Sequence, residues 1–134
     1  KLQERYSRHK DFPSFQNLES LSPSALAPTL DDLFLQKIRD FVEARLDDPD
    51  FGNPELARKM FLSESQLFRK IKALTGQSTA LHIRSIRLQN ARVMLQDSDM
   101  TVAEIAYLTG FNDPSYFTRV FSKEFGVVPG ELRR

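Results

Sequence analysis

Basic side chains are concentrated in the middle third of this 134-residue chain. Residues 58–92 carry eight basic and one acidic side chain, a net charge of +7, whereas residues 31–57 carry three basic and eight acidic side chains, a net charge of −5. Residues 93–134 carry four basic and six acidic side chains, a net charge of −2. Lysines and arginines gathered on one surface attract phosphate groups, so the middle third could face a nucleic-acid backbone. The alternative is an ordinary solvated helix surface.

Arg69 and Arg119 are the side chains best suited to reading a base. A guanidinium can donate to O6 and N7 of one guanine together, which discriminates against other bases by about 1–3 kcal/mol. Each arginine has an alternative role in a surface ion pair, with Glu64 for Arg69 and with Asp113 for Arg119. For both positions we favour the base contact.

Other kinds of chemistry find little support in the composition. The chain has no cysteine, which excludes disulfides and a cysteine-based zinc site. His9 and His82 are the only histidines and lack clustered carboxylates, so we expect no metal site. No glycine-rich phosphate loop and no pair of nucleophile and base appears, so we predict neither an enzyme nor a cofactor. No apolar run approaches the roughly 20 residues that span a bilayer, and we expect no membrane contact and a cytoplasmic location.

The stretch 101–126 predicts two short helices around a tight corner. Thr101 can cap the first helix, with Glu104 completing a capping box, and Gly110 is placed to end it. Asp113 can cap the second helix. Apolar residues recur in this second helix at helical spacing, namely Phe117, Val120, Phe121 and Phe125. The pattern is typical of a helix-turn-helix, whose second helix can lie in the major groove of DNA.

A second unit of the same kind lies at about residues 53–76. Asn53 is placed to cap its first helix and Ser63 its second helix, which ends at Gly76. The two units align at Glu55-Leu56-Ala57 with Glu104-Ile105-Ala106, at Leu67-x-Arg69-x-Ile71 with Phe117-x-Arg119-x-Phe121, and at Gly76 with Gly126. The offset, which is the difference in residue number between matched positions, grows from 49 before the corner to 50 after it, so the turns differ by one residue. A duplicated bihelical unit is more specific than either unit alone.

The remaining segments predict the scaffold around these units. An amphipathic helix spans 30–47, beginning after Pro28-Thr29. A helix from about 79 to 96, some 27 Å long, could hold the two units about one DNA turn apart, or could be the central post of a helical bundle. Residues 1–30 include segments rich in proline and serine and predict a linker. Because the chain opens on Lys1-Leu2-Gln3 without a methionine, we expect a fragment of a longer protein.

Residues 31–134 resemble the AraC-type (AraC/XylS) DNA-binding domain of bacterial transcription regulators. The motifs that carry the resemblance are Ser63-x-x-x-Leu67-x-Arg69-Lys70-x-Lys72-x-x-Thr75-Gly76, Arg87-Leu88-x-x-Ala91-x-x-x-Leu95, and Ile105-Ala106-x-x-x-Gly110-Phe111-x-Asp113-x-Ser115-Tyr116-Phe117-x-Arg119-x-Phe121-x-x-x-Phe125-Gly126-x-x-Pro129. The run SQLFRKIKALTG is similar to output domains of two-component response regulators and hybrid sensor kinases. The resemblance implies an all-α fold of about seven helices, in which two helix-turn-helix subdomains are joined by a long central helix. Residues 1–30 would then be the linker from an upstream receiver domain.

The resemblance also implies which side chains meet DNA. The base-facing positions are Ser65, Gln66, Phe68 and Arg69 in the first unit, and Ser115, Thr118 and Arg119 in the second. The phosphate-contacting positions are Lys70, Lys72, Ser78, Thr79, Arg84, Asn112 and Lys123, with Asn112 and Asp113 near the groove edge.

Four side chains, including the base-facing Phe68, have further predicted roles. Phe68 could pack against a thymine methyl group or cover the edge of the domain's own core. Arg87 is predicted to be structural, bridging the two halves, and Tyr116 and Phe117 are predicted to lie in the core. Since the basic charge lies around Arg69, the first unit should supply most of the affinity.

The leading hypothesis is a sequence-specific double-stranded DNA-binding output domain of a bacterial transcription regulator. Its full-length context would be a two-component phosphorelay acting as an activator, with a homodimer forming on activation and RNA polymerase as a partner. The alternative is a helical interaction module whose basic face binds an acidic protein. Parallel recognition helices on one face, about one DNA turn apart, would favour the DNA-binding hypothesis.

Overall fold

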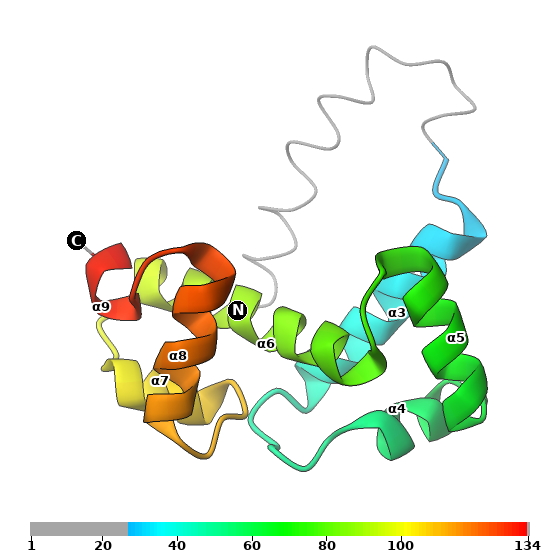
Figure 1. The fold of residues 1–134 in the computed structure, drawn as a ribbon, viewed down its shortest axis with the longest axis horizontal. Helices are drawn as coiled ribbons and strands as arrows, with labels where there is room; N and C mark the ends of the chain where they lie inside the picture. The colour runs from blue at the N-terminus through cyan, green and yellow to red at the C-terminus, as the bar shows by residue number, and fades with distance from the viewer. Residues whose placement is uncertain (1–26, 134) are drawn as a thin grey trace.

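The structure is a computed structural model that describes residues 27–133, and every regular element in that range is an α-helix. The helices are α3 (Leu30–Ala44), α4 (Asn53–Lys59), α5 (Glu64–Thr75), α6 (Thr79–Asp97), α7 (Val102–Leu108), α8 (Pro114–Phe125) and α9 (Pro129–Leu132) (Figure 1). The predicted all-α fold with seven helices is confirmed for this range. The predicted linker over residues 1–30 lies almost entirely outside the described residues.

The long helix α6 joins two separate hydrophobic cores (Figure 1). Its first half contributes Ile83 and Ile86 to a core shared with α3, α4 and α5. Its second half contributes Leu88, Ala91, Met94 and Leu95 to a core shared with α7 and α8. Because it is buried against one unit along its first turns and against the other along its last, α6 lacks the single apolar stripe of a surface helix. Each helix-turn-helix therefore has its own core, and α6 fixes one relative to the other.

The caps predicted from local sequence are largely confirmed. The hydroxyls of Ser63 and Thr101 and the carboxylate of Asp113 each accept a backbone hydrogen bond at the start of a helix, as predicted, and Ser78 caps α6 in the same way without having been predicted to do so. The first helix of the first unit differs, because Asn53 is its first residue and the preceding Gly52 donates its N–H to Glu55 Oε1 at 3.0 Å. The predicted cap at Asn53 is therefore wrong by one residue.

Helix α3 ends three residues earlier than predicted, at Ala44. Beyond it the backbone forms four-residue turns, in which the N–H of Arg45 bonds to the carbonyl of Val42 and the N–H of Asp48 bonds to the carbonyl of Arg45. Outside the helix, the carbonyl groups of Leu46 and Asp48 accept hydrogen bonds from Arg87 on α6, and that of Asp48 also accepts the N–H of Phe51.

Both helix-turn-helix corners begin with the same backbone motif. After α4, Leu62 N–H bonds to Ala57 O and Phe61 N–H bonds to Arg58 O; after α7, Phe111 bonds to Ala106 and Gly110 to Tyr107 in the same way. This is the Schellman motif, which requires a left-handed residue after the helix. Phe61 has φ of 59° and Gly110 has φ of 90°. The extra residue of the second turn lies after this motif, before the cap at Asp113, which accounts for the shifted offset.

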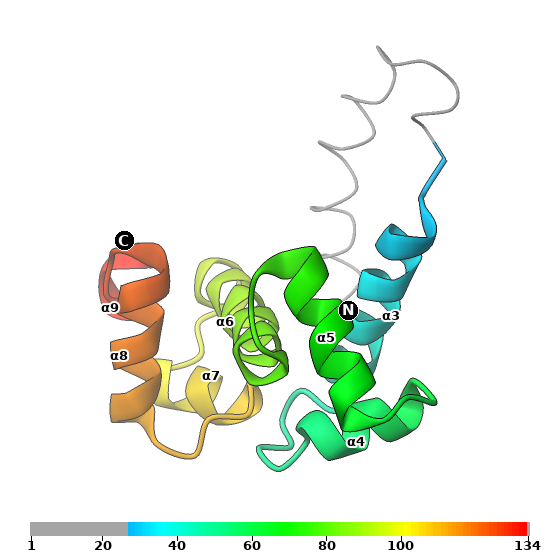
Figure 2. The same ribbon diagram turned by 45° about the vertical axis from the view of Figure 1, so that its right-hand side comes forward.

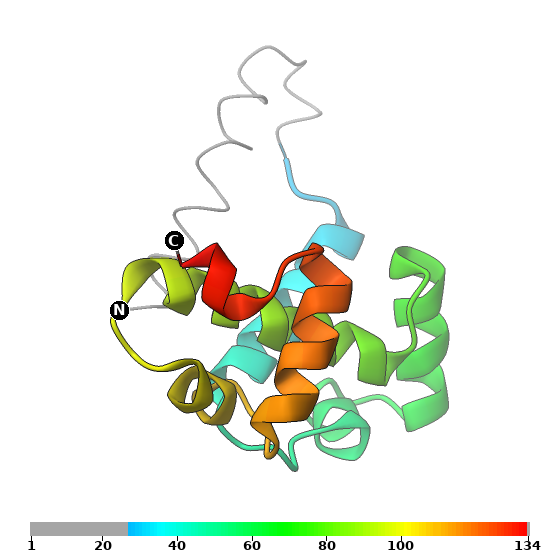
Figure 3. The ribbon, with the colours of Figure 1, turned by 60° about the vertical axis from the view of Figure 1, so that its left-hand side comes forward.

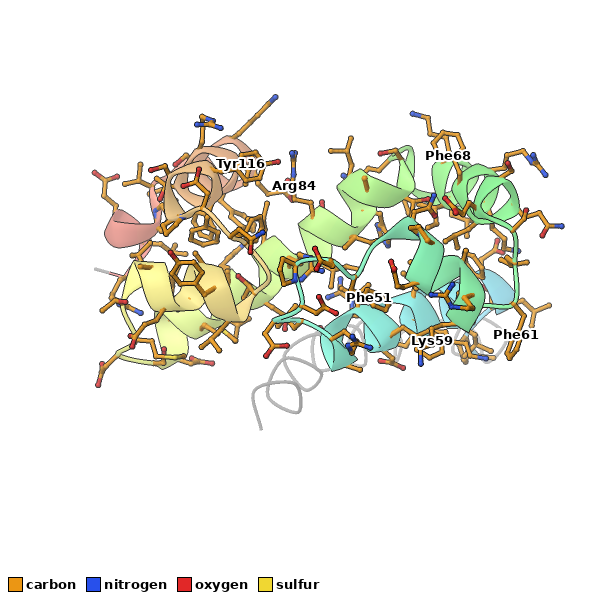
Figure 4. The ribbon with its side chains drawn as sticks, turned by 90° about the horizontal axis from the view of Figure 1, so that it is seen from below. Phe51, Lys59, Phe61, Phe68, Arg84 and Tyr116 are labelled. Carbon is orange, nitrogen blue, oxygen red and sulfur yellow. The ribbon has the colours of Figure 1, made fainter. Side chains whose placement is uncertain are left out.

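Phe61→Gly is expected to stabilise the protein by about 1 kcal/mol, because glycine enters the left-handed region without the steric cost that phenylalanine bears. Little packing would be lost, since Phe61 is 91% exposed and lies away from Phe68 on the far edge of the first unit (Figure 4). Urea denaturation would measure the change. Affinity for DNA should be unaltered, and a destabilised variant would contradict the assignment of strain to this residue.

Arg87 joins the two units at the middle of α6. Its side chain is 5% exposed, and its guanidinium donates to the carbonyl oxygens of Leu46, Asp48 and Phe51 in the α3–α4 loop and of Thr109 at the end of α7. Burial lowers the pKa of Arg87 from its ordinary value, while Asp48 and Asp47 act in the opposite direction. The predicted structural role of Arg87 is confirmed.

Candidate nucleic-acid interface

The two recognition helices, α5 and α8, stand on the same side of α6. In Figures 1, 2 and 3 both run upward from the corners of their units, and Figure 4, seen from below, looks along them at the upper edge of the molecule. The 19 residues of α6 span about 28 Å between the two units. This arrangement presents two nearly parallel helices to one ligand surface, as the duplicated motif predicts.

Helix α5 presents its four predicted base-facing side chains to solvent. Ser65, Gln66, Phe68 and Arg69 are all exposed, whereas Leu67 and Ile71 on the opposite face are buried. The predicted alternative ion pair of Arg69 with Glu64 is not formed, because Glu64 instead accepts a hydrogen bond from Asn53 at 3.1 Å. Arg69 has no ion pair among residues 27–133, so its guanidinium can meet an incoming ligand.

One end of the Gln66 side chain is used within the protein itself. Its side-chain oxygen accepts the backbone N–H of Ser63 at 2.9 Å, which completes the capping box at the start of α5. Only its amide NH₂ can then be offered to a base without breaking the cap. Phe68 is 42% exposed and belongs to neither core. Of its two predicted roles, contact with a thymine methyl group therefore fits better than covering the edge of the core.

Helix α8 is more closely coupled to its own neighbours. Ser115 and Arg119 are exposed and Thr118 is half-buried. Asp113 accepts the N–H of Ser115 at 2.9 Å, and Arg119 lies over the ring of Tyr116, with its Cζ 5.4 Å from the centroid. The alternative ion pair of Arg119 with Asp113 is therefore not what the structure shows.

The predicted phosphate-contacting residues differ in how accessible they are. Arg84, Asn112 and Lys123 lie at or near the surface, and Lys72 is exposed while donating to the carbonyl of Gly76 at 3.1 Å. Ser78 caps α6. Lys70 turns toward α3, where its Nζ lies 3.7 Å from Asp31 and 5.0 Å from the ring centroid of Phe34, so a phosphate would have to compete with these contacts.

Thr79 does not fit the predicted phosphate contact. Its side chain is 2% exposed, and its hydroxyl is enclosed by protein. The prediction followed from the resemblance, but the helix turns Thr79 inward. The expectation that this hydroxyl contacts a phosphate is therefore wrong.

Tyr116 is expected from the sequence to lie in the core beside Phe117, and the structure corrects this for Tyr116 alone. Phe117 is completely buried, whereas Tyr116 is 37% exposed beside Arg84 (Figure 4). The sequence position of Tyr116 could have predicted this exposure, because Tyr116 precedes Arg119 by three residues and so lies on the same face of the helix.

A cavity of about 270 Å³ lies between the two units. Its lining includes Phe51 and Asn53 from the first unit, Arg84 from α6, and Phe111 and Tyr116 from the second unit. Within the described range, no cluster of potential metal ligands occurs, and no helix is long and apolar enough to cross a membrane.

Residues 56–134 match the protein family described as "Helix-turn-helix domain". The chain is 30% identical over 120 residues to histidine kinase P4 of Formosa agariphila, a match that covers 89% of this chain and 9% of that protein. The fold is similar to the C-terminal domain of the two-component response regulator yesN from Fusobacterium nucleatum, with a TM-score of 0.65 and 26% identity over 74% of this chain and 96% of that one.

The DNA-binding domain of AdpA, a global transcriptional factor solved in complex with a target DNA, is similar with a TM-score of 0.66 and 25% identity, over 74% of this chain and 88% of that one. The chain spans less than a third of the length of the curated relatives it matches. The matched residues include both helix-turn-helix corners, α6 between them and both recognition helices. The chain belongs to the AraC-type family of helix-turn-helix DNA-binding domains.

Proposed function

We propose that this chain binds a specific double-stranded DNA sequence as the output domain of a bacterial transcription regulator. The observation that carries the proposal is the placement of α5 and α8 on one side of α6, with exposed base-facing side chains on both (Figure 4). Two such helices can enter successive major grooves on one face of DNA. The same placement favours DNA binding over the alternative of a protein-interaction module, which does not require two parallel helices on one face.

The wider context is part of the same proposal. Similarity to a histidine kinase and to a response regulator supports a role in a two-component phosphorelay. Phosphorylation of an upstream receiver domain would then promote pairing of two copies on repeated half-sites, and paired copies would recruit RNA polymerase as an activator does. Sedimentation with and without residues 1–30 would show whether that segment contributes to pairing.

Selection of binding sites from random DNA, followed by affinity measurements across salt concentrations, tests the DNA-binding proposal. We expect one preferred sequence and a steep decline of log affinity with log salt concentration, because each phosphate contact releases counterions. Equal binding to all sequences, or an affinity that salt does not alter, would overturn the proposal.

Arg69→Ala and Lys72→Ala are expected to differ in kind, although both change exposed residues of α5. Arg69→Ala should relax the preference at one base pair, costing about 1–3 kcal/mol on the preferred sequence only. Lys72→Ala should weaken all sequences alike and reduce the salt slope by about 0.9. Titrations of both variants on preferred and scrambled DNA make the comparison, and equal effects on specificity would count against these roles.

A further inference from the structure

Tyr116 lies between two arginines that come from different parts of the fold. Its hydroxyl oxygen accepts a hydrogen bond of 3.4 Å from Arg84 Nη1 on α6. Its ring lies beneath Arg119 of α8, whose Cζ is 5.4 Å from the centroid. The ring is supported on another side by Phe111, at 6.3 Å between centroids. Tyr116 therefore connects the central helix to the second recognition helix at the surface they share.

The surroundings of Arg84 favour an anion. Arg84, Arg87 and Tyr116 all line the cavity between the two units, and none of its eleven described lining residues is acidic. The hydrogen bonds of Arg87 all go to neutral carbonyl groups, and the carboxylates of Asp48 and Asp47, which do act on its charge, do not line the cavity. Two like charges beside a cavity that no carboxylate lines favour a negatively charged ligand.

The side chains also have hydrogen-bond donors to spare. Arg84 uses one of the five N–H groups of a guanidinium on Tyr116, and the hydroxyl of Tyr116, having accepted that bond, can donate its own proton. Figure 4 shows Arg84 projecting between the two recognition helices toward the same edge as Phe68, with Tyr116 beside it. The two donors thus converge at the surface that the base-facing residues share.

We propose that Arg84 and Tyr116 form one binding site for a DNA backbone phosphate, and that the ring of Tyr116 holds Arg119 toward the base it reads. The proposal rests on the proposed function and deepens it, because it names a contact that couples the two units. The phosphate lies between the two major grooves, where Arg84 from α6 and Tyr116 from α8 both reach it. Binding there fixes the second unit relative to α6.

Tyr116→Phe and Arg84→Gln test the phosphate site. Tyr116→Phe keeps the ring and should lower affinity for all sequences roughly tenfold, since a hydrogen bond to a charged group is lost, without altering the salt slope. Arg84→Gln should lower affinity and reduce the salt slope by about 0.9. The double variant should bind no more than about twofold more weakly than Arg84→Gln alone, because the two residues serve one phosphate. Additive losses would overturn a shared site.

Tyr116→Leu tests the role of the ring. This variant lacks both the hydroxyl and the face on which Arg119 lies, so it should relax the preference at one base pair, whereas Tyr116→Phe should retain that preference in full. Site selection with the two variants gives the comparison. An unchanged preference in Tyr116→Leu would overturn the proposed support of Arg119.

A chemical change in the DNA gives a measurement that does not depend on the folding of any variant. Replacing single phosphates between the two major grooves by neutral methylphosphonates should identify one position where wild-type affinity falls and where Arg84→Gln shows no further loss. If no such position exists while the wild type still selects a sequence, the phosphate site is wrong and the proposed function stands. If the wild type selects no sequence at all, the proposed function itself fails.

Discussion

Arg87→Met is expected to lower the free energy of unfolding by about 3–5 kcal/mol, which is among the largest effects of any single substitution in this chain. The guanidinium is 5% exposed and donates to four backbone carbonyl groups. Methionine fills a similar volume but donates no hydrogen bond, so the carbonyl groups of Leu46, Phe51 and Thr109 would lose their Arg87 partner. The carbonyl group of Asp48 would keep its second hydrogen bond, from the N–H of Phe51 at 3.2 Å. A buried polar group left unpaired costs about 1–3 kcal/mol. Urea denaturation measures the change.

The matched control is Arg92→Met, on the same helix. Arg92 is exposed and its guanidinium lies over Phe125 at 5.1 Å, an interaction that contributes about 0.5–1 kcal/mol at an exposed site. Arg87→Lys should fall between the two, because one ammonium keeps the charge but cannot reach four carbonyl groups in the fixed geometry of a guanidinium. If Arg87→Met were as stable as Arg92→Met, the hydrogen bonds of Arg87 to the four carbonyl groups, here called the Arg87 junction, would contribute little to stability.

The Arg87 junction also shows why part of this structure could not be predicted from sequence. Its four acceptors are backbone carbonyl groups, which every residue type has, so the amino-acid sequence does not identify them. They also lie 22 to 41 residues away in the chain. The resemblance and the position of Arg87 on the linking helix indicated a bridge but not its partners. The early end of α3 has the same origin, because the carbonyl groups beyond Ala44 serve Arg87 instead of continuing the helix.

Features with local causes were predicted well. The capping box of Thr101 and Glu104 depends on residues three apart, and the backbone of the final turn of α8 depends on Gly126. Exposure was predicted less well, because it depends on what packs across the helix. For this reason Thr79, which was expected at the surface, is buried, and Tyr116, which was expected in the core, is exposed. Similarly, the pairing of Lys70 with Asp31 follows from the packing of α5 beside α3.

The left-handed corner of the first unit was missed because the residue there is phenylalanine. At the matching corner of the second unit the expected glycine is present, and the structure gives two reasons for it. Gly110 has φ of 90°, and its missing side chain leaves room for Arg87. At Phe61 only the first reason applies, since the side chain projects into solvent. The repeat thus preserves the backbone conformation in both units, whereas only the second unit also requires the space.

Gly110→Ala is accordingly expected to destabilise the protein by about 4 kcal/mol or more. A Cβ atom at this position would overlap Arg87 Nη1 and would lie 2.6 Å from Arg87 Cζ and 2.7 Å from the carbonyl oxygen of Leu46. The side chain of Arg87 would have to leave its carbonyl partners to make room, so the cost of the lost junction adds to the cost of about 1–2 kcal/mol for a left-handed alanine. Urea denaturation measures this change as well.

Gly126→Ala isolates the backbone contribution to this effect. Gly126 is also left-handed, with φ of 74°, but a Cβ atom added there would meet no neighbouring atom within 4 Å, so only the conformational cost of about 1–2 kcal/mol should appear. The double variant Arg87→Met/Gly110→Ala should be less destabilised than the sum of its single variants, because both remove the same contacts. Equal denaturation midpoints for Gly110→Ala and Gly126→Ala would show that the second helix-turn-helix can accept a side chain at its corner without disturbing Arg87. The corner and the junction would then be independent features, and the tight coupling between the two DNA-reading units would have to come from α6 alone.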